Sequence, residues 1–238
     1  MSERDTEQVL HGRTKASFGQ DGQKDDLSGR RAVLLISVGQ RYHEGDKLRA
    51  TVELLNRTGF GQVTVAVADT LQRTNYLAHD PAEAHRRALR EGDAWLERNS
   101  KTLGRLSVPN DVLRWDEALR DPDYPRFLRR VRDAYRDDPG YRAAVDSTIR
   151  TFLDRMVSRN PCVDPRKAFE GCLSYLIEEC PVIQPMWAHQ GYDHIVYPQP
   201  MTTAMAHTHQ LFVAREYPGK GNWLSLRFKK RAASSLAA

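Results

Sequence analysis

The sequence predicts an α/β protein of the Rossmann type, with one mostly parallel sheet flanked by helices. Residues 32–36 form a continuous apolar run, which is typical of a strand buried on both faces. Residues 48–58 place their apolar side chains on one helical face, and residues 61–67 predict a second strand. A strand, a helix and a strand within about forty residues predict a parallel βαβ unit, the building block of an open α/β sheet.

Further elements complete the predicted domain. A helix is expected to begin at Pro81 and to end near residue 103, because proline favours the first helical turn and an apolar pattern follows it. The later elements are helices and short strands in turn: a strand at 111–115, helical chain at 125–159 with an interruption near Pro139, a helix at 165–179 stopped by Pro181, a strand at 195–197, a polar helix, and a last strand at 223–226.

Polar segments bound this domain at both ends. Residues 1–30 hold few apolar side chains and mix Gly, Gln, Ser, Lys and Asp, so we expect a disordered leader. The ordered domain is expected to span residues 31–228, and residues 229–238 are expected to form a loose tail. A chain of 238 residues is long enough for one sizeable core but not comfortably for two domains.

Composition and charge restrict the class of protein. Hydrophobic residues make up 40% of the chain and charged residues 28%, and no apolar run approaches the ~18–20 residues of a membrane helix. We therefore expect a soluble, monomeric protein without a membrane partner. Three widely spaced cysteines without a Cys-x-x-Cys motif favour a reduced, cytoplasmic environment. The net charge of +5 favours polyanionic partners such as nucleic acid.

Ser37 directly follows the first predicted strand. Ligands of open parallel sheets bind beyond the carboxyl ends of the strands, so this hydroxyl is a candidate for chemistry. The alternative is a serine that caps the next helix. Neither a glycine-rich dinucleotide motif nor a P-loop follows the strand, and the late histidines lack cysteine or carboxylate at ligand spacing. We therefore expect no cofactor and no metal.

A second candidate site lies on the predicted helix before Pro181. Tyr175 and Glu179 are four residues apart, so the phenol and the carboxylate share a helical face. Such a pair could bind a cationic amine, or it could simply brace the end of the helix. Tyr197 and Pro198 then follow at the end of a short predicted strand.

Together these residues resemble the cyclodipeptide synthases. The resemblance rests on Ser37 after the first strand, on Tyr175-x-x-x-Glu179-x-Pro181, on Tyr197-Pro198 and on the stretch at 68–76, and it covers roughly residues 31–228. Within the family, Tyr197-Pro198 is similar to the subfamily named for X-Tyr-Pro, whose first position corresponds to Gln40. One departure is Leu35, since well-known members have glycine two residues before the nucleophile.

The resemblance implies a fold, an activity and a set of partners. The fold would be related to the catalytic core of class I aminoacyl-tRNA synthetases of the tyrosyl and tryptophanyl type. The substrates would be two aminoacyl-tRNAs, with no ATP and no cofactor. The first aminoacyl group would move to Ser37 as an ester, and the second substrate would supply the amine that forms a dipeptidyl-enzyme. Ring closure would then release a cyclodipeptide.

The resemblance also implies roles for individual residues. Ser37 would be the nucleophile, and Tyr175 with Glu179 would hold the α-amino group of the first aminoacyl moiety. Tyr197 would orient the acyl group and relay a proton. Gln40 would support the serine loop and, with Pro198, belong to the substrate-binding site.

A basic helix is the predicted docking surface for tRNA. Family members use a basic helix in this region, and the matching cations on one face of the predicted helix at 81–103 are Arg87, Arg90, Arg98 and Lys101, with Arg86 adjacent. The alternative is a solvated face on which Glu83, Glu91, Asp93 and Glu97 pair with the cations. The arginines at 126, 129, 130 and 132 form a second candidate surface.

Two other functions remain open from the sequence alone. One is a non-catalytic RNA-binding protein on a Rossmann-like shell. The other is a serine hydrolase, which needs a histidine near Ser37, and His43 is the only candidate nearby in sequence.

Overall fold

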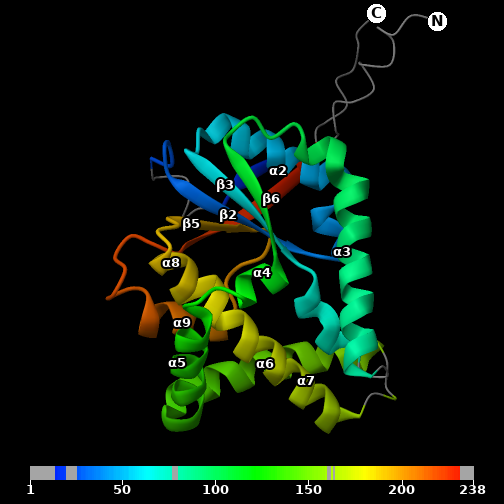
Figure 1. The fold of residues 1–238 in the computed structure, drawn as a ribbon, viewed down its shortest axis with the longest axis vertical. Helices are drawn as coiled ribbons and strands as arrows, with labels where there is room; N and C mark the ends of the chain where they lie inside the picture. The colour runs from blue at the N-terminus through cyan, green and yellow to red at the C-terminus, as the bar shows by residue number, and fades with distance from the viewer. Residues whose placement is uncertain (1–13, 20–25, 77–79, 160–161, 163, 231–238) are drawn as a thin grey trace, which may run out of the picture.

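A six-stranded sheet forms the centre of the protein in the computed structural model (Figure 1), which describes residues 14–19, 26–76, 80–159, 162 and 164–230. The strand order is β1-β6-β5-β2-β3-β4. The strands are β1 (Thr14–Phe18), β2 (Arg31–Ser37), β3 (Gln62–Ala68), β4 (Asn110–Arg114), β5 (His194–Tyr197) and β6 (Asn222–Lys230). Strands β2 to β6 run parallel and β1 pairs antiparallel with β6, so the predicted α/β class is confirmed.

The direction of strand order reverses beside β2. From β2 the chain moves outward through β3 to β4, and it then returns to the other side of β2 to form β5 and β6. Such a reversal leaves a crevice at the carboxyl ends of the two strands where the direction changes. In this sheet the reversal lies between β2 and β5, so a ligand site is expected there.

Two groups of helices cover the two faces of the sheet (Figure 1). One face packs against α2 (Gly45–Thr58) and α3 (Pro81–Leu103). The other face packs against a second group of helical elements: α4 (Trp115–Leu119), α5 (Tyr124–Asp137), α6 (Pro139–Arg159), α7 (Pro165–Pro181), a π-helical turn (Val182–Met186), α8 (Trp187–His189) and α9 (Thr203–Phe212). None of the described helices is long and apolar enough to cross a membrane.

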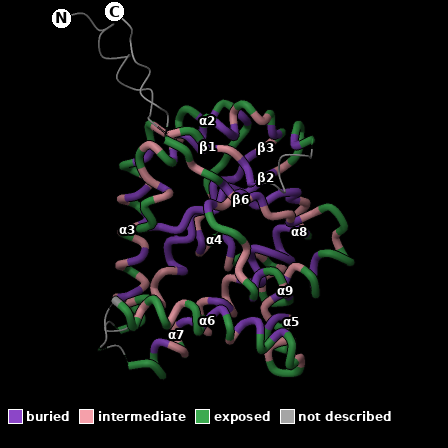
Figure 2. Tube along the Cα trace, turned by 180° about the vertical axis from the view of Figure 1, so that it is seen from behind, coloured by how far each residue is buried: buried purple, intermediate pink, exposed green. Residues whose placement is uncertain are grey.

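The side chains of β2 alternate between these two cores. Leu34 and Ile36 lie in the core beneath α2, whereas Val33 and Leu35 lie in the core on the opposite face. Because both faces are covered, every position of the strand favours an apolar residue, and the unbroken run at 32–36 is the result. Figure 2 shows the strands as the buried centre of the molecule, with exposed residues on the outer sides of the helices.

The leader expected over residues 1–30 contains a strand, so that prediction is wrong for residues 14–18. Ala16 and Phe18 of β1 are buried, and Phe18 lies edge-on against Phe60 with 6.3 Å between ring centroids. A five-residue alternation in a polar segment is a weak local signal, and the partner strand β6 lies at the far end of the sequence. The leader prediction is also wrong at Leu27, which is buried in the core beneath α2, and the tail prediction is wrong at Lys229 and Lys230, which belong to β6. Residues 1–13, 20–25 and 231–238 lie outside the described residues.

The predicted stop at Pro181 is also wrong. Pro181 lies inside the helical path, which continues through the π-helical turn Val182–Met186 into α8. A proline inside a helix removes one backbone hydrogen bond, and here Pro181 and Pro185 are both buried in the protein. Packing around this fully buried segment outweighs the local preference of proline to end a helix.

Candidate active site

Ser37 ends β2 at the reversal of strand order between β2 and β5, and it is 8% exposed. Tyr197 is the last residue of β5, and its hydroxyl lies 3.0 Å from Ser37 Oγ. The two residues are 160 positions apart in sequence, and the parallel pairing of the two strands brings them together. The N-cap positions of the following turn and helix are Gln40 and Glu44, so the interpretation of Ser37 as a helix cap is wrong.

Tyr42 is a member of this site that the sequence analysis missed. It lies in the 3-10 turn Arg41–His43, and its hydroxyl is 2.8 Å from the hydroxyl of Tyr197. Its half-buried ring packs edge-on against the rings of Tyr197 and His43, with centroid distances of 5.9 and 4.7 Å. The signal that could have identified it is its place five residues after Ser37, in the loop at the carboxyl end of the first strand.

Tyr175 and Glu179 lie one turn apart on α7, as their spacing predicts. The Tyr175 hydroxyl donates a hydrogen bond to Oε1 of Glu179 at 3.4 Å. Burial raises the pKa of Glu179 to about 8, although the hydrogen bond from Tyr175 opposes the rise. Burial, followed by the negative charge of Glu179, raises the pKa of Tyr175 well above its usual value.

The carboxyl group of Glu179 also affects the pKa values of Tyr42 and Tyr197. Burial raises the pKa of Tyr42 and of Tyr197, and the negative charge of Glu179 adds to the rise in both. One site therefore gathers a serine hydroxyl, three phenols and one carboxyl group from β2, the following turn, α7 and β5. A carboxyl with a pKa of about 8 is close to an α-amino group at ~7.7–8.0, so proton exchange between the two is nearly balanced.

Glu178, the neighbour of Glu179, has a different environment. It forms an ion pair with Arg73 and accepts a hydrogen bond from Nε1 of Trp115 at 2.9 Å. The side chain of Glu178 is 15% exposed and that of Arg73 is 28% exposed. Glu178 therefore connects α7 to the turn Thr70–Asn75 and to α4, and it acts as a structural brace.

The other predicted residues of this site lie near Ser37 in the chain or next to Tyr197. Leu35 lies two residues before Ser37 on the same face of β2 and is 2% exposed, so the leucine fills the core beneath the serine. Gln40 is exposed, and its backbone closes the turn by donating to the carbonyl of Ser37 at 3.3 Å. Pro198 is buried directly after Tyr197.

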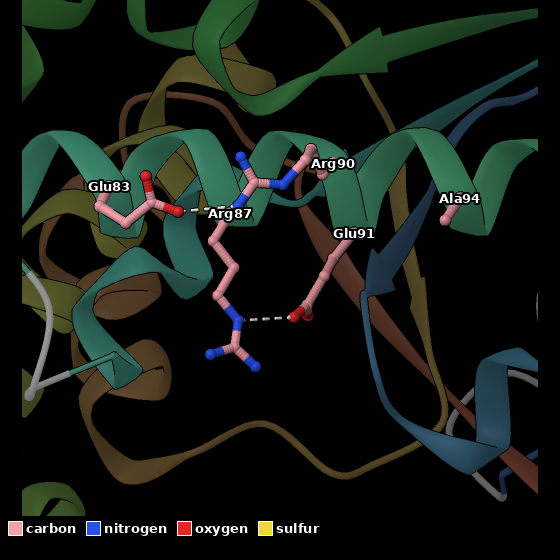
Figure 3. A pocket seen from close by; sticks show the side chains of 5 residues that line it. All are labelled: Glu83, Arg87, Arg90, Glu91 and Ala94. Atoms are coloured by element: carbon pink, nitrogen blue, oxygen red, sulfur yellow. Dashed lines mark hydrogen bonds and ion pairs between the residues drawn. The ribbon is translucent and has the colours of Figure 1, made fainter.

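The basic face predicted on α3 carries its cations in ion pairs. Arg86 and Arg90 both pair with Glu83, at 2.9 and 2.8 Å. Arg87 pairs with Glu91 at 3.1 Å, and Arg98 pairs with Glu44 at 3.0 Å. A hollow of about 400 Å³ on this face is lined by Glu83, Arg87, Arg90, Glu91 and Ala94 (Figure 3). Within the described part of the chain, Lys101 is the member of the predicted set that has no ion pair.

The second predicted basic cluster, on α5, is partly paired. Arg126 pairs with Asp123 at 3.3 Å, and Arg130 pairs with Glu216. Arg129 and Arg132 are exposed, and neither makes an ion pair among the residues that the structure describes.

A third basic surface, which the sequence analysis missed, is the ribbon formed by β1 and the outer half of β6. Trp223, Arg227 and Lys229 point to the same face of β6, because strand side chains alternate. The Trp223 ring lies 5.6 Å from that of Tyr197, so this face leads outward from the crevice. Lys15 of β1 lies directly opposite Lys229. Arg227, Lys229 and Lys15 are exposed, and in the described ranges none of them has an ion-pair partner.

The family model described as "Cyclodipeptide synthase" matches residues 17–191, well over half of the chain. No curated protein sequence matches the chain. Among solved structures, a cyclodipeptide synthase from Fluoribacter dumoffii is 35% identical, with a TM-score of 0.86 over 91% of this chain and 98% of that one.

Two more distant structures share the fold. A cyclodipeptide synthase from Candidatus Glomeribacter gigasporarum, bound to Phe-tRNAPhe, is 21% identical with a TM-score of 0.72 over 93% of this chain and 97% of that one. A Mycobacterium tuberculosis protein is 18% identical with a TM-score of 0.63 over 92% and 94% of the two chains. The structure of that protein is described as demonstrating that cyclodipeptide synthetases are related to type I tRNA synthetases.

Proposed function

Because the chain belongs to the cyclodipeptide synthase family, it is an aminoacyltransferase that makes cyclodipeptides from aminoacyl-tRNAs, and we propose that Ser37 is its nucleophile. The observation that carries this proposal is the contact of 3.0 Å between Ser37 Oγ and the Tyr197 hydroxyl at the crevice. The combination of Gln40 with Tyr197 and Pro198 supports a place in the X-Tyr-Pro subfamily. A cytoplasmic location and a monomeric state remain predictions from the sequence.

In the proposed first step, Ser37 Oγ attacks the carbonyl carbon of an aminoacyl-tRNA. The new C–Oγ bond forms, the bond to the ribose oxygen breaks, and the proton of Ser37 ends on that oxygen. One ester replaces another, so the step is close to energetic balance and needs no ATP. A good ester also needs no strong base, which fits the phenol rather than an imidazole beside Ser37.

Tyr175 and Glu179 are proposed to bind the α-amino group of the aminoacyl moiety. A cationic amine beside Glu179 would favour the ionised carboxylate and lower its raised pKa. The same carboxylate can then accept a proton from the amine of the second substrate, because its burial favours the protonated form. The uncharged amine attacks the Ser37 ester and forms the dipeptidyl-enzyme.

Ring closure is the proposed last step. The peptide must adopt a cis-like geometry, which costs ~2.5–4 kcal/mol for a non-proline bond. The amine and the ester are held in one site, and such proximity contributes up to ~7–11 kcal/mol in favourable cases. Proximity of this size can offset the cost of the strained geometry.

Two surfaces are proposed to dock the tRNA. The first is the α3 face of Arg86, Arg87, Arg90, Arg98 and Lys101. The second is the β1–β6 ribbon of Lys15, Arg227 and Lys229, which is supported by its path from Tyr197 and by its unpaired cations. The relative bound to Phe-tRNAPhe is consistent with a whole tRNA as the substrate.

The substitution Ser37→Ala tests the proposal. Purified aminoacyl-tRNAs are incubated with each protein without ATP, and mass spectrometry measures cyclodipeptide and the mass of the intact enzyme. We expect the parent protein to release cyclodipeptide and to carry an acyl adduct, and the variant to do neither while still binding tRNA. Full product release from Ser37→Ala would contradict the assignment. Binding of tRNA by the parent without any product would favour a non-catalytic RNA-binding protein.

A further inference from the structure

The Tyr197 hydroxyl has two hydroxyl neighbours, Ser37 Oγ at 3.0 Å and the Tyr42 hydroxyl at 2.8 Å. A phenol has one proton, so Tyr197 donates to one neighbour and accepts from the other. The chain of three hydroxyls therefore has two proton arrangements. In the outward arrangement Ser37 donates to Tyr197 and Tyr197 donates to Tyr42. In the inward arrangement Tyr42 donates to Tyr197 and Tyr197 donates to Ser37.

The chemical state of Ser37 selects between these arrangements. Free Ser37 has a proton, and in the outward arrangement Oγ donates it to Tyr197. The lone pairs of Oγ are then free to attack the substrate. An acylated Ser37 has no proton to donate, so only the inward arrangement satisfies every hydroxyl in the chain. In that arrangement the Tyr197 proton faces Ser37 Oγ, the atom that must leave when the ring closes.

We propose that Tyr42 is a positioning residue for ring closure, because it holds Tyr197 as a proton donor toward Ser37 Oγ. This inference rests on the proposed function of Ser37. In the step, the amine nitrogen bonds to the ester carbonyl carbon, the C–Oγ bond breaks, and its electron pair goes to Oγ. Oγ takes the proton of Tyr197, and the surplus proton of the new amide nitrogen returns to Tyr197. No other reactant is required.

The surroundings of Tyr42 fit a fixed donor. Its ring is held between Tyr197 and His43, and the turn is attached to α3 because Trp95 Nε1 donates to the His43 carbonyl at 3.1 Å. Burial lowers the pKa of His43 to about 3, so this ring is uncharged at neutral pH. Burial also raises the pKa of Tyr42 and of Tyr197, so both phenols keep their protons. Charge that develops on Tyr197 during the step is stabilised by the hydrogen bond from Tyr42.

The test is Tyr42→Phe, which removes the hydroxyl and keeps the ring. Single-turnover assays measure the rate of Ser37 acylation and the rate of cyclodipeptide release. We expect acylation within about threefold of the parent and release slowed by about 10- to 100-fold, with accumulation of dipeptidyl-enzyme in intact-protein mass spectra. Tyr135→Phe is the matched control, because Tyr135 is a half-buried phenol on α5 that donates to Asp146 at 3.0 Å. It should change neither rate.

A double-mutant cycle separates positioning from a general loss of structure. If Tyr42 acts through Tyr197, then Tyr42→Phe has no further effect on release in a Tyr197→Phe background. An equal slowing of release in both backgrounds would overturn the proposal, and so would unchanged release in the single variant. All rates are measured well below each variant's melting temperature, so that loss of fold does not enter. If the parent protein itself forms no acyl adduct on Ser37, the proposed function fails first and this inference fails with it.

Discussion

The α3 face and the β1–β6 ribbon are both basic, but they differ in what their cations contact. On α3, the arginines at 86, 87, 90 and 98 each pair with a glutamate. On the ribbon, Lys15, Arg227 and Lys229 have no such partner within the described ranges, and Lys15 lies opposite another cation. A polyanion gains more from the second kind of surface, because it need not compete with a carboxylate for the cation. The count of basic residues is therefore a poorer guide to a docking surface than the count of unpaired ones.

The same contrast appears between two adjacent residues of α7. Glu178 has a cation, Arg73, and a second donor in Trp115, so its charge is used within the fold. Glu179 has a phenol beside it and a raised pKa, so a cationic substrate can supply the missing partner. In both comparisons the unpaired charge is the one available to a substrate.

The largest expected effect comes from separating the two glutamates. Glu179→Gln should lower kcat/KM about 10²- to 10³-fold, because it removes the proposed acceptor of the amine proton. Glu178→Gln should instead destabilise the fold by about 1–3 kcal/mol, because it weakens an ion pair and leaves Arg73 poorly paired. Product assays and thermal melts on both variants check this. A loss of activity in folded Glu178→Gln as large as that of Glu179→Gln would remove the contrast.

Charge reversal on the ribbon should have the next largest effect. Arg227→Glu together with Lys229→Glu should raise the apparent KM for aminoacyl-tRNA about 10- to 100-fold. The slope of the logarithm of the binding constant against the logarithm of salt concentration should become shallower by about 2. The fold should not suffer, because Glu at 229 would face Lys15 as an opposite charge.

The control for the ribbon variant has the same change in net charge. Arg150→Glu together with Arg155→Glu alters two exposed arginines of α6, at a distance from β6 in Figure 1. KM should change little in this control. Equal effects of the two double variants would mean that only the overall charge of the protein matters.

Charge reversal on α3 should have a smaller effect on KM than charge reversal on the ribbon. Arg87→Glu together with Arg90→Glu should raise KM about 3- to 10-fold, since tRNA must already displace Glu91 and Glu83 to contact these arginines. Glu83→Gln is the informative partner variant, because it releases both Arg86 and Arg90 and should tighten tRNA binding slightly. Electrophoretic mobility shifts at several salt concentrations measure both. An α3 effect larger than the ribbon effect would reverse the comparison.

The smallest expected effect is on stability. The pKa of Glu179 is raised to about 8 in the folded protein, so the fold binds a proton that the unfolded chain releases above its ordinary glutamate pKa. The stability contributed by this proton is fully present at low pH and is lost as pH rises from the ordinary value to about 8. Glu179→Gln removes this loss, so its melting temperature should exceed that of the parent by a few degrees at pH 8.5 and by less at pH 6. An identical difference at both pH values would contradict the raised pKa.

Local patterns in the sequence predicted much of this structure. The run at 32–36 defined β2 because both of its faces are buried, and the four-residue spacing of Tyr175 and Glu179 placed both on one face of α7. Tyr42 and β1 were not predicted, because their importance depends on partners that are distant in sequence, namely Tyr197 and β6. The ion pairs of α3 were expected only as an alternative. The spacing of charged residues along a helix shows which side chains can form ion pairs, but it does not show which of them do.

The antiparallel pairing of β1 with β6 has a consequence for the order in which the protein is completed. During synthesis β1 emerges first and β6 emerges last among the strands, so β1 has no partner until nearly all of the described chain has been made. The pairing of β2 with β5, which brings Ser37 and Tyr197 together, can form before that moment, but the basic ribbon cannot. A ribosome-bound, incomplete chain therefore lacks this surface, whereas its α3 face is already complete.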